Sequence, residues 1–193
     1  MKYAVLNKIF YEILCEKIWN LPEKIQELKE EYKKYFSKKY DIFISYRHDG
    51  GQYLALLLFE HLKAKGMKVF LDVDSMKVGH FDEQIYDVIE SCKYLLFVVS
   101  PGCIKKLVED DDWVAKELVK ASEIGCKILP IYMEKVSIIE KEKIDKLLMS
   151  KESVPDKLEN LLKALPTFQS LEAKANVFDS IVDRIMDTLS EGK

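Results

Sequence analysis

The sequence predicts an α/β fold: a flavodoxin-like doubly wound parallel sheet of about five strands, preceded by an extra N-terminal helical segment. Two observations support this prediction. From residue 40 onward, short apolar runs alternate with segments of helical periodicity, and this alternation implies right-handed crossovers between parallel strands. The run 94–100 is almost entirely apolar up to Pro101, as expected for a central strand that is buried on both faces.

The first 38 residues form a section of their own. Apolar side chains recur there at helical spacing, and Pro22 is placed to start a second helix. We therefore divide the chain into an N-terminal helical segment, residues 1–38, and one main domain, residues 39–190. Two interpretations of the segment stay open at this point: a prefix packed on the main domain, or a helix for self-association or partner docking.

The main domain alternates strands and helices. The first half predicts strands at 40–46, 67–72 and 94–100, with helices at 52–65 and from Phe81 to about Cys92. The second half predicts a helix at 111–124, a strand at 127–132, a helix starting at Pro155, a short fifth strand at 167–171 and a closing helix at 177–189.

Composition and charge limit the classes of function. The net charge is −3 without a basic stripe, which argues against nucleic acid as a partner. No apolar run approaches the length of a membrane span, and the first residues do not resemble a secretion signal, so we expect a cytoplasmic protein without a membrane partner. The four cysteines and three histidines lack metal-ligand spacing, so we expect reduced thiols and no metal.

Several polar side chains follow the predicted strands directly. Tyr46 and Arg47 come after the first strand, Asp72 ends the second, and Ser100 follows the third. Because parallel strands end at the same edge, these side chains are expected to share that edge, near the switch point between the first and third strands. The loop after the third strand leads to the helix that carries Trp113 and Glu117, so one crevice can collect all of these groups.

Trp113 and Glu117 are four residues apart near the start of their predicted helix, and therefore lie on one face. An aromatic plane beside a carboxylate suits a ligand with a flat cationic ring. The alternative is an ordinary amphipathic helix, in which Trp113 covers the edge of the core and Glu117 pairs with Lys120 in solvent. The spacing alone leaves both interpretations open.

Other chemistries of this fold lack their motifs. Gly50-Gly51 is too short for a phosphate-binding or dinucleotide fingerprint. Ser100 has no nucleophile-elbow sequence around it. A receiver-type phosphoacceptor needs acidic residues where this chain has Tyr46-Arg47 and Ser100-Pro101.

Three blocks in order resemble TIR domains: Tyr-Asp-Ile-Phe-Ile-Ser-Tyr-Arg at 40–47, Val-Phe-Leu-Asp at 69–72 followed by Gly-His-Phe at 79–81, and Asp-Trp-Val-Ala-Lys-Glu at 112–117. The resemblance covers about 40–132, with a TIR-like end up to about 189. It is strongest to the catalytic TIR domains of bacterial defence proteins and of the animal enzyme of axon degeneration.

This resemblance implies an enzyme that cleaves the nicotinamide–ribose bond of NAD+, which is a substrate and not a cofactor. Glu117 would be the catalytic glutamate, with Trp113 and Phe81 as pocket aromatics and Tyr46, Arg47 and Asp72 lining the nucleotide site. The product, linear or cyclic ADP-ribose or a conjugate, stays open.

The resemblance also implies partners and a setting: homotypic TIR–TIR self-association, a separate sensor or effector protein, and antiphage defence or immune signalling. The other class of function is a non-enzymatic TIR adaptor module. Glu117 favours the enzyme, whereas the loop 72–79 lacks the proline of animal adaptor TIR domains.

Overall fold

The computed structural model describes residues 40–71, 81–174 and 178–190, apart from the side chains of 81–84. By its internal contacts the chain divides after Lys38. The helices expected within residues 1–38 lie outside the described residues, as does the loop 72–80.

The described chain builds a five-stranded parallel sheet in the order β2-β1-β3-β4-β5. The strands are β1 (Ile42–Ser45), β2 (Val69–Leu71), β3 (Tyr94–Val99), β4 (Lys127–Met133) and β5 (Leu171–Ala173). Every residue of β1 and β3 is buried, which explains why their sequences are apolar on both faces. The order confirms the predicted flavodoxin-like sheet, and its switch point lies between β1 and β3.

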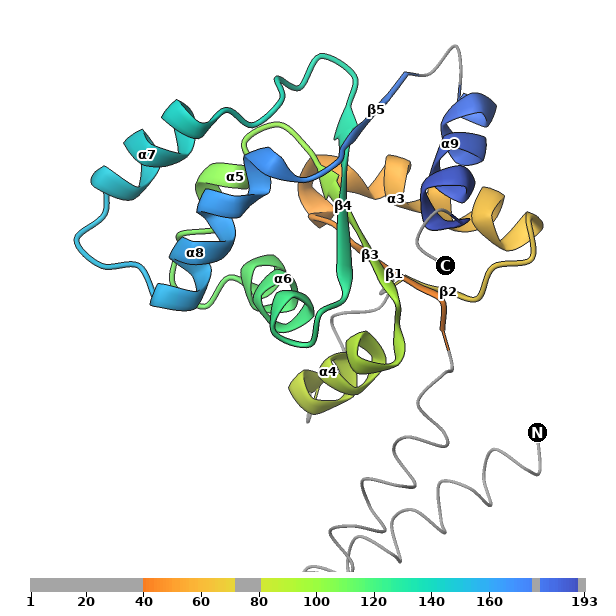
Figure 1. Cartoon of the computed structure of the whole chain (residues 1–193), viewed down its shortest axis with the longest axis horizontal. Helices are drawn as coiled ribbons and strands as arrows, with labels where there is room; N and C mark the ends of the chain where they lie inside the picture. The colour runs from red at the N-terminus through yellow and green to blue at the C-terminus, as the bar shows by residue number, and fades with distance from the viewer. Residues whose placement is uncertain (1–39, 72–80, 175–177, 191–193) are drawn as a thin grey trace, which may run out of the picture. The chain divides into compact units, whose positions relative to one another are not determined.

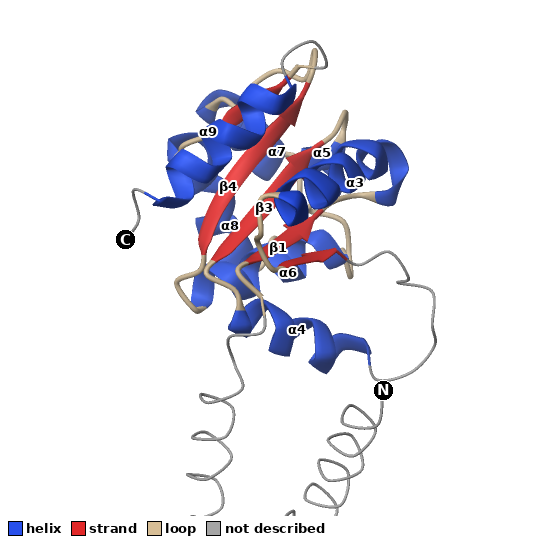
Figure 2. Ribbon diagram, turned by 90° about the vertical axis from the view of Figure 1, so that its right-hand side faces the viewer, coloured by secondary structure: helices blue, strands red, loops and turns tan. Residues whose placement is uncertain are grey.

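Helices cover both faces of the sheet (Figures 1 and 2). One face carries α3 (His48–Ala64) and α9 (Phe178–Ser190), and the other carries α4 (Phe81–Ser91), α6 (Trp113–Glu123) and α8 (Asp156–Ala164). Short helices α5 (Cys103–Lys106), α7 (Lys141–Met149) and η1 (Leu165–Thr167) complete the described elements. Within the described ranges, none of the helices has both the length and the apolar character that crossing a bilayer requires.

Strand alternation assigns each side chain at the end of β1 to one of two cores. Phe43 belongs to the core beneath α4, α6 and α8, whereas Ile42, Ile44 and Tyr46 belong to the core beneath α3 and α9. Successive strand residues point to opposite faces, so Ser45 continues the Phe43 row toward α6. The polar end of β1 is thereby split between the two sides of the sheet.

Two segments differ from the sequence-based expectation. The fifth strand begins at Leu171, and Leu165–Thr167 forms a 3-10 turn, so the predicted range 167–171 is wrong except for its last residue. Pro166 favours the 3-10 turn, because its fixed φ suits the first positions of a helix, and β5 begins where Leu171 pairs with Ile131 of β4. The first helix starts at His48 and is kinked at Asp49 and Gly50, where Gly50 adopts a φ of +85° that glycine tolerates well.

Candidate functional site

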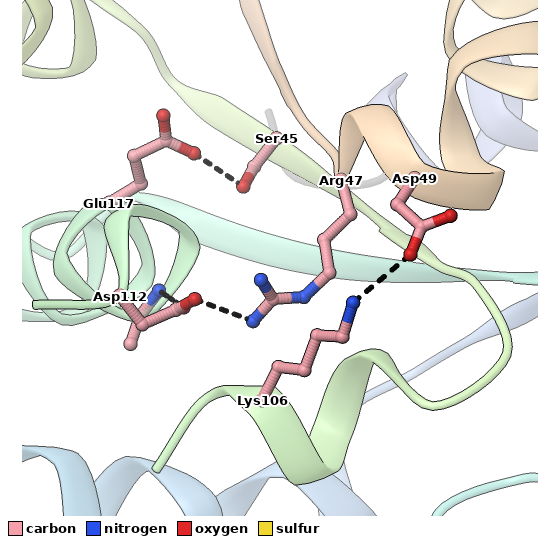
Figure 3. A network of polar contacts seen from close by, with 7 residues as sticks. Ser45, Arg47, Asp49, Lys106, Asp112 and Glu117 are labelled. Carbon is pink, nitrogen blue, oxygen red and sulfur yellow. Dashed lines mark hydrogen bonds and ion pairs between the residues drawn. The ribbon is translucent and has the colours of Figure 1, made fainter. Parts of the chain in front are cut away.

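A buried hydrogen bond joins the end of β1 to α6. Ser45 Oγ donates to Glu117 Oε2 at 2.6 Å, although the two residues are 72 positions apart (Figure 3). Ser45 is 1% exposed and Glu117 is 8% exposed. A carboxylate is rarely buried to this degree unless polar groups compensate its lost hydration, so Glu117 sits in a polar niche that the fold provides.

A second contact ties the same two elements together at the start of α6. Arg47 Nη2 lies 2.8 Å from Asp112 Oδ2, with the two side chains 13% and 8% exposed. Asp112 is also the N-cap of α6, and its Oδ1 accepts from the Ala115 backbone N–H at 2.8 Å. Asp112 thus stabilises the helix that carries Glu117 while it neutralises Arg47.

The Arg47 guanidinium does not use all of its donors. Its buried Nε and Nη2 make no well-aligned hydrogen bond with the residues that the structure describes, so the contact with Asp112 is an ion pair of imperfect hydrogen-bond geometry. Such a guanidinium keeps donor capacity for an anion such as a phosphate. Arg47 is therefore both a structural partner of α6 and a candidate anion-binding group.

Ser100, at the end of the neighbouring strand β3, presents a contrast to Ser45. It is also 1% exposed, yet its Oγ has no well-aligned hydrogen-bond partner among the described residues, although the weakly polar thiol of Cys103 interacts with it. Burial raises the pKa of Cys103 to about 11, although the Ser100 backbone and the charge of Arg47 act in the opposite direction. A thiol in this state is a poor nucleophile.

The surroundings of Glu117 exclude the interpretation that it is a solvent-exposed residue of an ordinary amphipathic helix. Glu117 does not lie in solvent, and Lys120 instead pairs with Glu90 at 2.6 Å. Trp113, one turn earlier on α6, is 40% exposed, with Lys116 Nζ 4.6 Å from its ring centroid. The alternative in which Glu117 pairs with Lys120 in solvent is therefore wrong. The exposed Trp113 ring can also contact a cation, as its contact with Lys116 shows.

The remaining expected site residues are placed differently or lie outside the description. Tyr46 is 7% exposed and packs in the core beneath α3 and α9, and its ring centroid lies 5.0 Å from that of His48 with the ring planes tilted by 47°. It therefore leaves β1 on the face opposite Ser45. Asp72 lies outside the described residues, and Phe81 begins α4 with a side chain that is not described. Their roles stay predictions.

Two hollows of the described surface are not lined by Glu117. One of about 410 Å3 is bordered by α7 and α8, including Met149 and Lys163, and another of about 300 Å3 lies at the amino edge of the sheet beside Cys92 and Cys126. Among the described residues, no three His, Cys, Asp or Glu side chains are placed to hold a metal ion. Neither hollow combines a buried carboxylate with a cation, so the carboxyl edge remains the candidate site.

The sequence analysis missed the supporting residues Ser45 and Asp112. Both had a local signal: Ser45 follows the strand alternation from Phe43, and Asp112 precedes a helix as an N-cap residue does. The sequence does not show that α6 packs against the end of β1. This packing brings Ser45 to Glu117 and Asp112 to Arg47.

Comparisons with known proteins agree with this architecture. The family model described as TIR domain matches residues 42–162. The chain is 32% identical over 131 residues to a Drosophila melanogaster protein named NAD(+) hydrolase sarm1, which covers 66% of this chain and 9% of that protein. It is 40% identical over 99 residues to the Caenorhabditis elegans NAD(+) hydrolase tir-1, which covers 50% of this chain and 10% of that protein. The chain thus spans about a tenth of the length of these relatives.

A solved structure shares the fold. The TIR domains in the activated Roq1 resistosome, which directly recognises the pathogen effector XopQ, superpose with a TM-score of 0.58 at 19% identity, over 78% of this chain and 99% of theirs. At that identity the likeness supports the order and layering of the elements, and not the chemistry of the site.

Proposed function

The chain belongs to the TIR domain family, and we propose that it cleaves the bond between nicotinamide and ribose in NAD+. The observation that carries this proposal is Glu117: a carboxylate that is 8% exposed, hydrogen-bonded to Ser45, at the edge where α/β sheets of this kind bind ligands. The relatives named NAD(+) hydrolase support the substrate.

The reaction suits a single carboxylate. Nicotinamide in NAD+ is already cationic, so the electron pair of the breaking bond moves to its ring nitrogen and neutral nicotinamide leaves without being protonated. The positive charge then passes to the ribose as an oxocarbenium-like centre. A fixed carboxylate stabilises that charge electrostatically in a site that excludes water. Glu117 has the burial and fixation for this role, whereas Asp112, whose side chain is also 8% exposed, is already paired with Arg47 and caps α6.

Arg47 and Trp113 supply the complementary interactions in this proposal. The incompletely bonded guanidinium of Arg47 would bind the pyrophosphate of NAD+. The Trp113 ring, which Lys116 now covers at 4.6 Å, would stack on the cationic nicotinamide after the lysine moves away. Asp72 and Phe81 stay predicted members of this site from the family resemblance, whereas Tyr46 packs on the opposite face of the sheet.

The nucleophile determines the product. Water attacking the ribose gives ADP-ribose, nicotinamide and a proton, whereas an internal attack by the adenine base or a ribose hydroxyl gives a cyclic isomer. The described residues do not distinguish these routes, so the proposal is NAD+ cleavage with a linear or cyclic product. A setting in antiphage defence or immune signalling stays a prediction from the family resemblance.

One surface favours self-association as a further part of the function. Tyr53 and Leu57, one turn apart on α3, are 85% and 47% exposed. Exposed apolar pairs of this size are common at interfaces between proteins. We propose that copies of the chain associate in the active state; a purely adaptor role would use the same surface without turnover.

Incubation of the purified chain with NAD+, followed by chromatography and mass spectrometry, tests the enzymatic proposal. We expect nicotinamide release whose specific rate rises with protein concentration, and loss of at least about 100-fold in the Glu117→Gln variant. Circular dichroism and thermal melting control for folding. A Glu117→Gln variant that releases nicotinamide at the wild-type rate contradicts the role of Glu117. A wild-type chain that associates but releases none, even at high concentration, supports the adaptor role.

A further inference from the structure

The bond between Ser45 and Glu117 has features that ordinary packing does not require. Its length of 2.6 Å lies in the range of hydrogen bonds from a hydroxyl to a charged oxygen. Both partners are buried, so neither can easily exchange the other for water. The contact spans two elements, because Ser45 ends a central strand and Glu117 lies one turn inside α6.

The strand holds Ser45 rigidly. β1 lies between β2 and β3, and Ser45 pairs in register with Phe97. Glu117, by contrast, has a long side chain that loses rotamer freedom when it is held in one orientation. The serine therefore provides a fixed donor that selects one orientation of a flexible carboxylate.

We propose that Ser45 is a positioning residue for Glu117: its hydroxyl fixes the carboxylate in the orientation that faces the ribose. This inference rests on the proposed NAD+ cleavage. Ser45 acts through Glu117, and no contact of Ser45 with substrate is required. A hydrogen bond to a charged group contributes enough free energy to change a rate about 10- to 100-fold.

Ser100 provides a matched control within the same chain. It is also a serine at the carboxyl end of a central parallel strand, it is equally buried at 1% exposure, and among the described residues its Oγ meets only the weakly polar Cys103 thiol without a well-aligned hydrogen bond. Ser100→Ala therefore removes the same atom from the same edge of the sheet without removing a donor to Glu117. Removal of an unpaired buried hydroxyl is expected to be nearly neutral for stability.

The experiment compares nicotinamide release by the wild-type chain and the Ser45→Ala, Ser45→Thr, Ser100→Ala and Glu117→Gln variants at equal protein concentration. We expect Ser45→Ala to lower kcat about 10- to 100-fold while KM changes less than about threefold, because binding contacts elsewhere are kept. Ser45→Thr keeps the hydroxyl and is expected to recover part of kcat, and Ser100→Ala to stay within about twofold of the wild-type kcat. Thermal melting of each variant separates folding from positioning.

Each other outcome rejects a defined part of the account. Equal losses of kcat in Ser45→Ala and Ser100→Ala reject positioning in favour of a packing effect. A Ser45→Ala variant with wild-type kcat rejects positioning but leaves the proposed function intact if Glu117→Gln is inactive. A Glu117→Gln variant with wild-type kcat, or a wild-type chain that releases no nicotinamide, rejects the proposed function and the role of Ser45 with it.

Discussion

The two edges of the sheet bury polar atoms in opposite ways. At the amino edge, Cys92 and Cys126 are buried thiols, and burial raises the pKa of each to about 12, so they remain neutral. At the carboxyl edge, Glu117 is buried with Ser45 as donor, and Asp112 is buried beside Arg47. The amino edge therefore buries neutral groups, whereas the carboxyl edge buries carboxyl groups that have polar or charged partners.

This difference supports the carboxyl edge as the place of the proposed site. A buried ion pair is weak support for stability, because apolar residues of similar volume often stabilise a fold as well or better. The charges at the carboxyl edge are therefore better explained by a role in binding and catalysis than by folding alone. Substitutions at the two edges are therefore expected to differ in their effects on stability and on nicotinamide release.

The largest effect on stability is expected at Asp112. Asp112→Ala removes both the α6 cap and the partner of the buried Arg47, so we expect the free energy of unfolding to fall by about 3 kcal/mol. Asp112→Asn keeps a capping oxygen and loses only the charge, so its loss should be smaller by about 1 kcal/mol. Urea unfolding measures both variants. Equal losses would show that Asp112 does not act as a cap.

A smaller effect is expected at the amino edge and only at alkaline pH. The thiols of Cys92 and Cys126 ionise near their ordinary pKa of 9.0 when unfolded but near 12 when folded, so the unfolded chain binds fewer protons between these values. Stability is therefore expected to fall as pH rises above 9, by about 1 kcal/mol for each thiol at pH 10.

Urea unfolding at pH 8 and pH 10 tests this prediction, with the Cys92→Ala/Cys126→Ala double variant as the control. The double variant should lose less stability than the wild-type chain over this interval, and its nicotinamide release at pH 8 should stay within about twofold of wild type. An identical loss in both chains contradicts the assignment, and a large loss of activity in the double variant breaks the contrast between the edges.

The smallest effect is expected at the rim of the carboxyl edge. Lys106 Nζ lies 3.1 Å from Asp49 Oδ2, but the two side chains are 41% and 86% exposed (Figure 3). Exposed pairs contribute about 0–1 kcal/mol, so Lys106→Ala should change the melting temperature little, and less at high salt. A loss comparable to that of Asp112→Ala would show that charge at this edge stabilises the fold regardless of burial.

Sequence patterns predicted the sheet better than the site. The apolar runs of β1 and β3 required a central position, and the structure confirms it. The start of β5 was not predictable from its own residues, because the pairing of Leu171 with Ile131 in β4 decides it. Similarly, Glu117 was recognisable by family resemblance, but its contact with Ser45 depends on how α6 docks on the sheet. Local sequence patterns do not show which residues 72 positions apart come into contact.

Amide chemical shifts in the folded Glu117→Gln variant, titrated with NAD+, test the central claim most directly, because a slow variant leaves the substrate intact during the measurement. We predict shifts at the carboxyl edge, in residues 45–51 and 112–117, and none at the amino edge, in residues 92–94 and 125–127. Shifts confined to the amino edge, or no shifts at millimolar NAD+, would contradict the claim that NAD+ binds beside Glu117.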